Sequence, residues 1–147
     1  QGDEPLIEPR DIKKVVEASL MYPDTIINAM CPILTPEDFT NSSIPKVVTS
    51  QSEKLLFISR SPIPIDKNRN FKKAMKQVCI YSFPSEKLQM FGTMNSKTPL
   101  EEIEDIEILR FIEMGIEVRM VEVSSSSIAV DHPEDVEKVI KALNDSA

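Results

Sequence analysis

Two short acidic motifs, one at each end of the chain, place the strongest constraint on how it can fold. Gln1-Gly2-Asp3-Glu4-Pro5 opens the sequence, and Val130-Asp131-His132-Pro133-Glu134-Asp135 lies near its end. In each motif an aspartate is followed by proline and then by a helical pattern, which is typical of the exit from a strand. Ligands of open α/β sheets bind beyond the carboxyl ends of strands, so Asp3 and Asp131 could share one divalent cation. An ordinary turn is the alternative for either motif taken alone.

Helical and strand patterns alternate at both ends of the chain, and this predicts an α/β fold. Helices are expected over 9–21, 84–91, 98–114 and 133–143, and strands over 25–33, 45–50, 54–59, 75–83, 116–123 and 128–130. Thr98, Pro99 and Glu101 have the pattern of a capping box, which makes 98–114 the helix with the strongest signals. The middle of the chain is rich in strands instead. We therefore expect one domain over 1–147 with a β-rich insertion at about 41–74.

Composition excludes several classes of partner. The chain has 147 residues, a formal net charge of −7 and a pI near 4.8, which argues against binding a nucleic-acid backbone. No apolar run approaches the roughly 18 residues that span a bilayer. Cys31 and Cys79 lie far apart in apolar surroundings, which favours unpaired thiols in a reducing cytoplasm. We expect a cytoplasmic protein that binds neither nucleic acid nor a membrane.

The chain opens inside a motif, without a methionine and without a strand before Gln1. Its three glycines, Gly2, Gly92 and Gly115, are scattered, whereas a loop that cradles phosphates needs clustered glycines. We therefore expect that a preceding strand and nucleotide loop are missing from this sequence.

Four further residues are candidates for binding a substrate. Arg60 follows an apolar strand and could clamp a carboxylate or fix the loop, or it could be a solvated strand end. Gln77 and Tyr81 alternate on one predicted strand and share a face, where Tyr81 could bind a sugar hydroxyl or be an ordinary half-buried tyrosine. Glu107 is expected at the edge of the buried face of the 98–114 helix. His132, the single histidine, has no partner motif for a triad.

Several motifs occur together in one order along the chain. They are Gln1-Gly2-Asp3-Glu4-Pro5, Ser59-Arg60-Ser61-Pro62-Ile63-Pro64, Ile80-Tyr81, Thr98-Pro99-Leu100-Glu101 with Glu107 and Leu109-Arg110, and Val130-Asp131-His132-Pro133-Glu134-Asp135. This series resembles the later part of the 3-deoxy-manno-octulosonate (Kdo) cytidylyltransferase family, the CMP-Kdo synthetases, over essentially the whole chain.

The resemblance implies a Rossmann-like nucleotidyltransferase fold that forms a homodimer. It implies transfer of CMP from CTP to an acidic eight- or nine-carbon sugar, with Mg²⁺ as cofactor and release of pyrophosphate. By motif position, Asp3 and Asp131 correspond to metal-binding, catalytic aspartates. Gln1, Gln77, Tyr81 and Glu107 correspond to sugar-contacting positions, and Arg60 belongs to one of the family's motifs.

The sequence departs from the family at two of these sugar-contacting positions. The family usually has His at the position of Gln77 and Gln at the position of Ile108. A sialic-acid-like sugar or a modified Kdo therefore stays open as the substrate. A non-catalytic dimerising module is the alternative if the chain is complete, and the chain alone is expected not to turn over CTP.

Overall fold

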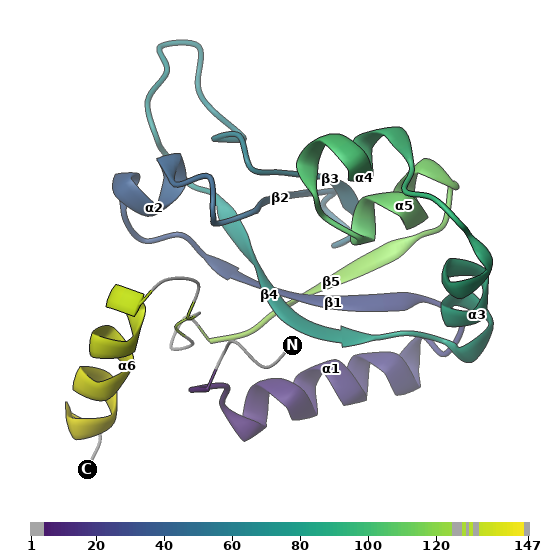
Figure 1. The fold of residues 1–147 in the computed structure, drawn as a ribbon, viewed down its shortest axis with the longest axis horizontal. Helices are drawn as coiled ribbons and strands as arrows, with labels where there is room; N and C mark the ends of the chain where they lie inside the picture. Colours follow the sequence, from purple (N-terminus) through teal and green to yellow (C-terminus); the bar gives the residue numbers. More distant parts are fainter. Residues whose placement is uncertain (1–4, 125–127, 129, 131–132, 146–147) are drawn as a thin grey trace.

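The computed structural model describes residues 5–124, 128, 130 and 133–145 and shows a mixed sheet with helices on both faces (Figure 1). The helices are α1 (Pro9–Met21), α2 (Pro36–Thr40), α3 (Ser85–Thr93), α4 (Pro99–Glu104), α5 (Ile108–Glu113) and α6 (Pro133–Asp145). The strands are β1 (Ile26–Pro32), β2 (Lys46–Thr49), β3 (Leu55–Ser59), β4 (Met75–Ser82) and β5 (Val118–Glu122). The predicted α/β class is confirmed.

The five strands form one sheet in the order β3-β2-β4-β1-β5. β1 and β5 are parallel, whereas β4 runs antiparallel to both β1 and β2, and β2 and β3 form a hairpin. The hairpin predicted within 45–59 thus continues the main sheet by pairing with β4.

The sheet curls so that the tip of the β2–β3 hairpin meets β5. Lys54 forms a bridge with Arg119, and the Met120 amide donates to the Glu53 carbonyl at 2.8 Å. Arg119 also donates to the Ser52 carbonyl at 3.0 Å. These contacts cover part of the outer edge of β5, which would otherwise expose unpaired backbone groups.

Each face of the sheet has its own core, because β1 is buried on both sides. Val15 and Ala18 of α1 pack on Ile27, Ala29 and Cys31 of β1. The opposite core is contributed mainly by α4, α5 and the strands: its buried members are Ile26, Met30, Val47, Leu55, Ile58, Ile106, Ile108, Leu109, Phe111, Val118 and Met120. We call this second side the α5 face of the sheet, and the candidate sugar-binding residues of β4 lie on it.

The single helix predicted over 98–114 is wrong, because the structure breaks it into α4 and α5. Asp105 ends α4 in the left-handed conformation, with φ 53° and ψ 49°. Arg60 supplies the physical reason, since its guanidinium donates to the carbonyls of Glu104 (2.6 Å) and Asp105 (3.2 Å). Those bonds satisfy the last carbonyls of α4, so the backbone turns there instead of continuing.

The other helices agree closely with the sequence-based prediction. α1 spans Pro9–Met21 as expected, with proline in its first turn. The predicted strand at 128–130 is not found in its described residues, because Ile128 and Val130 carry no strand structure. Cys31 and Cys79 form no disulfide, as expected.

Candidate functional site

The candidate sugar-binding residues Gln77 and Tyr81 lie on β4 and face the α5 side of the sheet. Tyr81 packs against the core beneath α5, and its ring stacks on Phe83 with centroids 5.6 Å apart. Its hydroxyl lies 4.0 Å from Cys79 Sγ, and both residues are half-buried. The face predicted to carry Gln77 and Tyr81 therefore also brings the Cys79 sulfur near the Tyr81 hydroxyl.

A β-bulge between β1 and β4 shapes the part of β4 that carries Gln77 and Tyr81. Asn28 pairs with Tyr81, but the next residue, Ala29, pairs with Val78, so that β4 carries extra residues at this point. The Asn28 side chain, fully buried, donates to the carbonyls of Val78 (3.0 Å) and Ile80 (3.1 Å). Gln77 Nε2 donates to Asn28 Oδ1 at 2.9 Å.

Arg60 ties the end of β3 to the turn between α4 and α5. Besides the two α4 carbonyls, its guanidinium donates to the Ser42 carbonyl at 3.1 Å. The Glu104 carboxylate accepts from the Arg60 amide (2.8 Å) and from Ser59 Oγ (2.6 Å). These contacts match the loop-fixing role considered for Arg60, whose donors reach backbone carbonyls.

Lys46, beside this cluster, is fully buried although lysine is seldom buried without a partner. Its ammonium donates to the carbonyls of Asn41 and Ile44, both at 2.7 Å. Burial lowers the pKa of Lys46, and the charge of Arg60 lowers it further against the opposing pull of Glu104.

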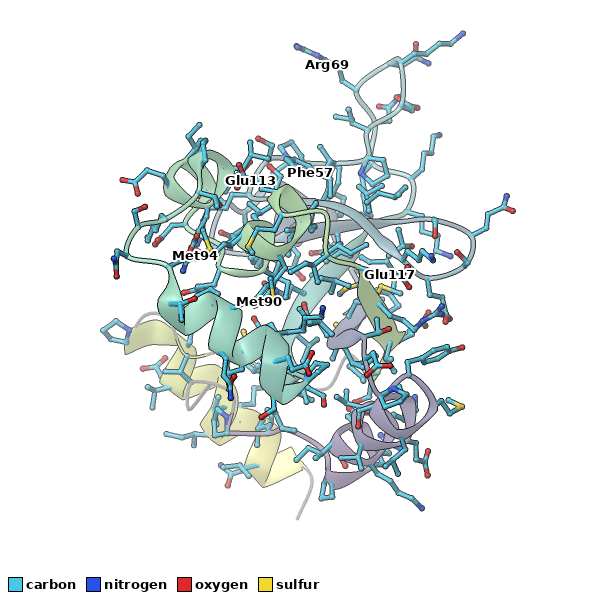
Figure 2. The ribbon with its side chains drawn as sticks, turned by 90° about the vertical axis from the view of Figure 1, so that its right-hand side faces the viewer. Phe57, Arg69, Met90, Met94, Glu113 and Glu117 are labelled. Atoms are coloured by element: carbon cyan, nitrogen blue, oxygen red, sulfur yellow. The ribbon has the colours of Figure 1, made fainter. Side chains whose placement is uncertain are left out.

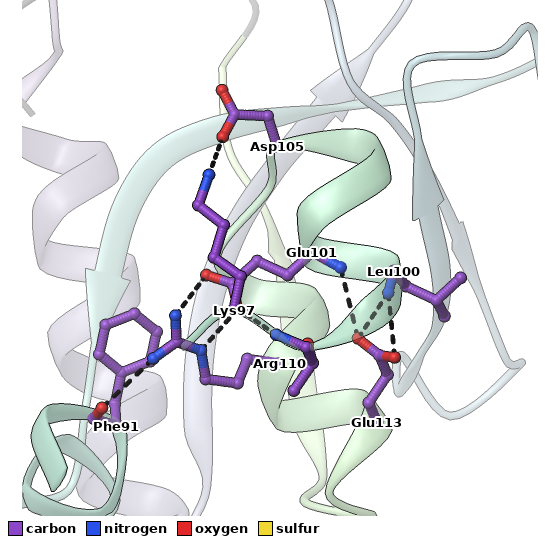
Figure 3. A network of polar contacts seen from close by, with 8 residues as sticks. Phe91, Lys97, Leu100, Glu101, Asp105, Arg110 and Glu113 are labelled. Carbon is purple, nitrogen blue, oxygen red and sulfur yellow. Dashed lines mark hydrogen bonds and ion pairs between the residues drawn. The ribbon is translucent and has the colours of Figure 1, made fainter. Parts of the chain in front are cut away.

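The α4–α5 unit is held together by a buried ion pair (Figure 3). Arg110 Nε and Nη2 donate to the Glu101 carboxylate at 2.6 and 2.7 Å, and only 8% and 1% of the two side chains are exposed. Arg110 also lies over the Phe91 ring, 3.9 Å from its centroid. Burial alone raises the pKa of Glu101, but the Arg110 and Thr98 hydrogen bonds outweigh it and lower the pKa.

A second carboxylate fixes the start of α4. Glu113 of α5 accepts from the amides of Leu100 (3.0 Å) and Glu101 (3.3 Å), which are otherwise unsatisfied donors at a helix N-terminus (Figure 3). Lys97 pairs with Asp105 at the other end of the helix. Glu107, two residues after Asp105, is the exposed N-cap residue of α5, so the same network positions this candidate residue.

Gln1, Asp3 and Asp131 lie outside the described residues, so their predicted convergence stays a prediction. Farther along the chain, Asp11 and Ser124 are in contact: the Ser124 amide donates to the buried Asp11 carboxylate at 3.1 Å, and Ser124 Oγ bonds the same carboxylate. Asp11 follows the Asp3 motif and Ser124 precedes the Asp131 motif.

Elsewhere the described residues offer few alternatives. They contain no group of three or more His, Cys, Asp or Glu placed to hold a metal ion. They also contain no helix long and apolar enough to cross a membrane. A pocket of about 360 Å³ lies between α2 and the 62–71 loop, and no predicted site residue lines it.

Sequence reasoning missed Asn28, Lys46 and Glu104. Asn28 left the clearest signal, because it is the one polar side chain within the apolar run of β1. Glu104 resembled an ordinary surface charge, because its partners Ser59 and Arg60 lie far away in the sequence. Lys46 resembled an ordinary strand residue, because its burial depends on the fold of the loop just before it. Ile108, one of the two departures noted above, is 2% exposed, so it contributes to the core and presents nothing to a ligand.

The mixed α/β sheet is consistent with the Rossmann-like nucleotidyltransferase fold that the motifs predict, and comparisons with known proteins agree. A family model with the description "Cytidylyltransferase" matches residues 1–123. The chain belongs to this cytidylyltransferase family. A solved CMP:2-keto-3-deoxy-manno-octonic acid synthetase complexed with CTP superimposes with a TM-score of 0.89 at 30% identity, covering 100% of this chain and 61% of that one.

Curated relatives carry the name predicted from the motifs, 3-deoxy-manno-octulosonate cytidylyltransferase. The protein from Nitratiruptor sp. is 39% identical over 142 residues, covering 95% of this chain and 59% of its own length. The Escherichia coli protein is 33% identical, covering 95% and 56%, and the mitochondrial Arabidopsis thaliana protein is 36% identical, covering 95% and 49%. The chain thus spans about half to three-fifths of these relatives, and the resemblance stated from the motifs is confirmed.

Proposed function

We propose that this chain is the sugar- and metal-binding part of an enzyme that transfers CMP from CTP to Kdo. In this reaction the anomeric hydroxyl of the sugar attacks the α-phosphorus, the bond to the β-phosphate breaks, and pyrophosphate leaves. The observation that carries the proposal is the match of the whole chain to a CMP-Kdo synthetase that binds CTP. A cytoplasmic location is part of this proposal, because CTP and the other substrates of such an enzyme are cytoplasmic metabolites.

The sugar is proposed to lie along the α5 face, against Gln77 and Tyr81 of β4, with Glu107 and Gln1 as further contacts. Gln77 and Tyr81 are half-buried, which suits residues that touch a ligand and still keep a defined orientation. Arg60 is proposed to act without touching the sugar, because its guanidinium holds the α4–α5 turn that carries Glu107.

The proposed Mg²⁺ ligands are the carboxylates of Asp3 and Asp131. Mg²⁺ prefers one or two carboxylates together with water and substrate phosphates, so this donor set fits the ion. The Asp11–Ser124 contact supports the pairing, because it joins the segment after Asp3 to the segment before Asp131. When bound, the ion would help to neutralise the triphosphate.

Two other readings compete with this one. A sialic-acid-like or modified sugar is the closer alternative, favoured by Gln77 at a position where the family usually has histidine. A non-catalytic dimerising module is the other. One experiment distinguishes these functions: the complete gene product is incubated with CTP, Mg²⁺ and equal amounts of Kdo and N-acetylneuraminate, and the products are identified by mass spectrometry. CMP-Kdo is the expected product, CMP-neuraminate would favour the first alternative, and no product would favour the second.

We also propose that the protein forms a homodimer through the region around 45–71. The 66–73 loop projects from the body of the molecule with Arg69 near its tip (Figure 2). The Asp66 carboxylate shapes it by accepting from the amides of Asn68 and Asn70, both at 2.8 Å. Lys67, Arg69, Lys72 and Lys73 are exposed on a chain of net charge −7, so a second copy offers an acidic partner.

Sedimentation over micromolar concentrations should therefore show a dimer. The variant Lys67→Glu with Arg69→Glu is expected to weaken the dimer by about tenfold or more, because it places like charges across the contact. The matched control Arg10→Glu with Lys13→Glu makes the same charge change on the exposed side of α1 and should leave the dimer intact. A monomeric wild-type protein would contradict the dimer, and equal weakening by both variants would contradict this location.

A further inference from the structure

Asn28 is a buried polar side chain in the middle of an apolar strand. It has no exposed surface, and its neighbours on the same strand face, Ile26 and Met30, belong to the core under α5. An amide in such surroundings is costly unless its hydrogen bonds are satisfied. The residue therefore calls for a role that an apolar side chain could not perform.

The hydrogen bonds of Asn28 leave one orientation for its amide. Both hydrogens of Nδ2 are donated, to the carbonyls of Val78 and Ile80 at the β4 bulge. A flipped amide would point Oδ1 at these two carbonyl oxygens, which is repulsive. Oδ1 must therefore be the atom that faces Gln77.

The orientation of Asn28 in turn fixes the orientation of Gln77. Because Asn28 presents the acceptor Oδ1, Gln77 donates to it with Nε2, and the two atoms lie 2.9 Å apart. The amide of Gln77 is planar, so its carbonyl oxygen Oε1 points away from Asn28. Gln77 is half-buried and lies on the same face as Tyr81.

We infer that Asn28 is a positioning residue that makes Gln77 present its carbonyl oxygen as a hydrogen-bond acceptor to a hydroxyl of the sugar. The inference rests on the proposed function and adds a residue that never touches the substrate. It also explains how glutamine can serve where histidine is usual: a neutral imidazole can likewise donate with one nitrogen and accept with the other.

The test is a set of sugar KM values measured by pyrophosphate release from the complete gene product. Gln77→Met is expected to raise the KM for Kdo about fivefold, the scale of one lost neutral hydrogen bond, with the KM for CTP unchanged. Gln77→His should raise it less, because histidine restores a donor and an acceptor. Gln51→Met, an exposed glutamine in the β2–β3 turn, is the matched control and should change neither KM.

Asn28→Ser should raise the KM for Kdo as well, and combining it with Gln77→Met should add little, since both changes remove the same contact. Additive effects, or an unchanged KM in Gln77→Met, would overturn the inference while the proposed function stands. If Asn28→Ser fails to fold, equal KM values for Gln77→His and Gln77→Met would overturn it. An inactive wild-type enzyme would instead overturn the proposed function on which the inference rests.

Discussion

Replacing Asp131 with asparagine is expected to lower CTP turnover of the complete gene product by about two orders of magnitude or more, the scale of a lost electrostatic contact to a transition state. The change is nearly isosteric but removes one of the two negative charges proposed to hold Mg²⁺. A neutral amide oxygen binds this hard cation more weakly than a carboxylate does. Turnover is measured as pyrophosphate release at saturating CTP and Kdo.

An aspartate-to-asparagine change at another position is the control, because it distinguishes loss of a metal ligand from a general effect of removing one negative charge. Asp24→Asn alters an exposed aspartate between α1 and β1 and should leave turnover unchanged. In Asp131→Asn, raising the Mg²⁺ concentration should recover part of the lost rate, since weaker binding is then compensated. Undiminished turnover in Asp131→Asn would remove this residue from the site.

Glu101→Gln is expected to destabilise the fold by about 3 kcal/mol, because it leaves the buried Arg110 guanidinium without its counter-charge. The two side chains are 1% and 8% exposed, so water cannot replace the lost partner. The double change Glu101→Gln with Arg110→Met should cost less than Glu101→Gln alone, since no unpaired charge remains. Urea denaturation measures each free energy of unfolding.

The exposed pair of Lys13 and Glu17 provides the control. Lys13→Met breaks an ion pair whose side chains are 76% and 58% exposed and should leave the unfolding midpoint unchanged. A midpoint in Glu101→Gln that equals that of Lys13→Met would contradict a structural role for the buried pair.

The same pair predicts how stability responds to acid. The folded-state pKa of Glu101 lies below its ordinary value of 4.5, so the pair stabilises the fold fully above that pH. This stability should be lost as the pH falls through the lowered pKa. The acid-induced loss should shrink in the double variant, whereas an unchanged loss would assign it to other carboxylates such as Glu113, whose pKa is also lowered.

Local sequence patterns predicted most of the elements because those elements are decided locally. The proline at the start of α1 and the apolar run of β1 are examples, and both elements lie where they were expected. The break after Glu104 was invisible to such patterns, because it depends on hydrogen bonds from Arg60, far away in the sequence. Ile103, whose spacing is typical of the buried face of a continuous helix over 98–114, is 78% exposed.

The candidate site was predicted in outline through its motifs, but not in its supporting contacts. Gln77 and Tyr81 share a face because alternation along a strand requires it. Asn28 was overlooked, since its importance arises from a bulge in the neighbouring strand that no local pattern announces. Lys46 was read as part of an ordinary strand, because its burial depends on carbonyls of the preceding loop.

The central claim is cytidylyl transfer to Kdo, and pyrophosphate release from CTP tests it most directly. The complete gene product should release pyrophosphate only when Kdo and Mg²⁺ are both present, and the 147-residue chain alone should release none. The second expectation follows from chemistry, since a triphosphate needs donors such as a glycine-rich loop that this sequence lacks. Release that does not depend on Kdo, or no release by the complete product under these conditions, would contradict the account.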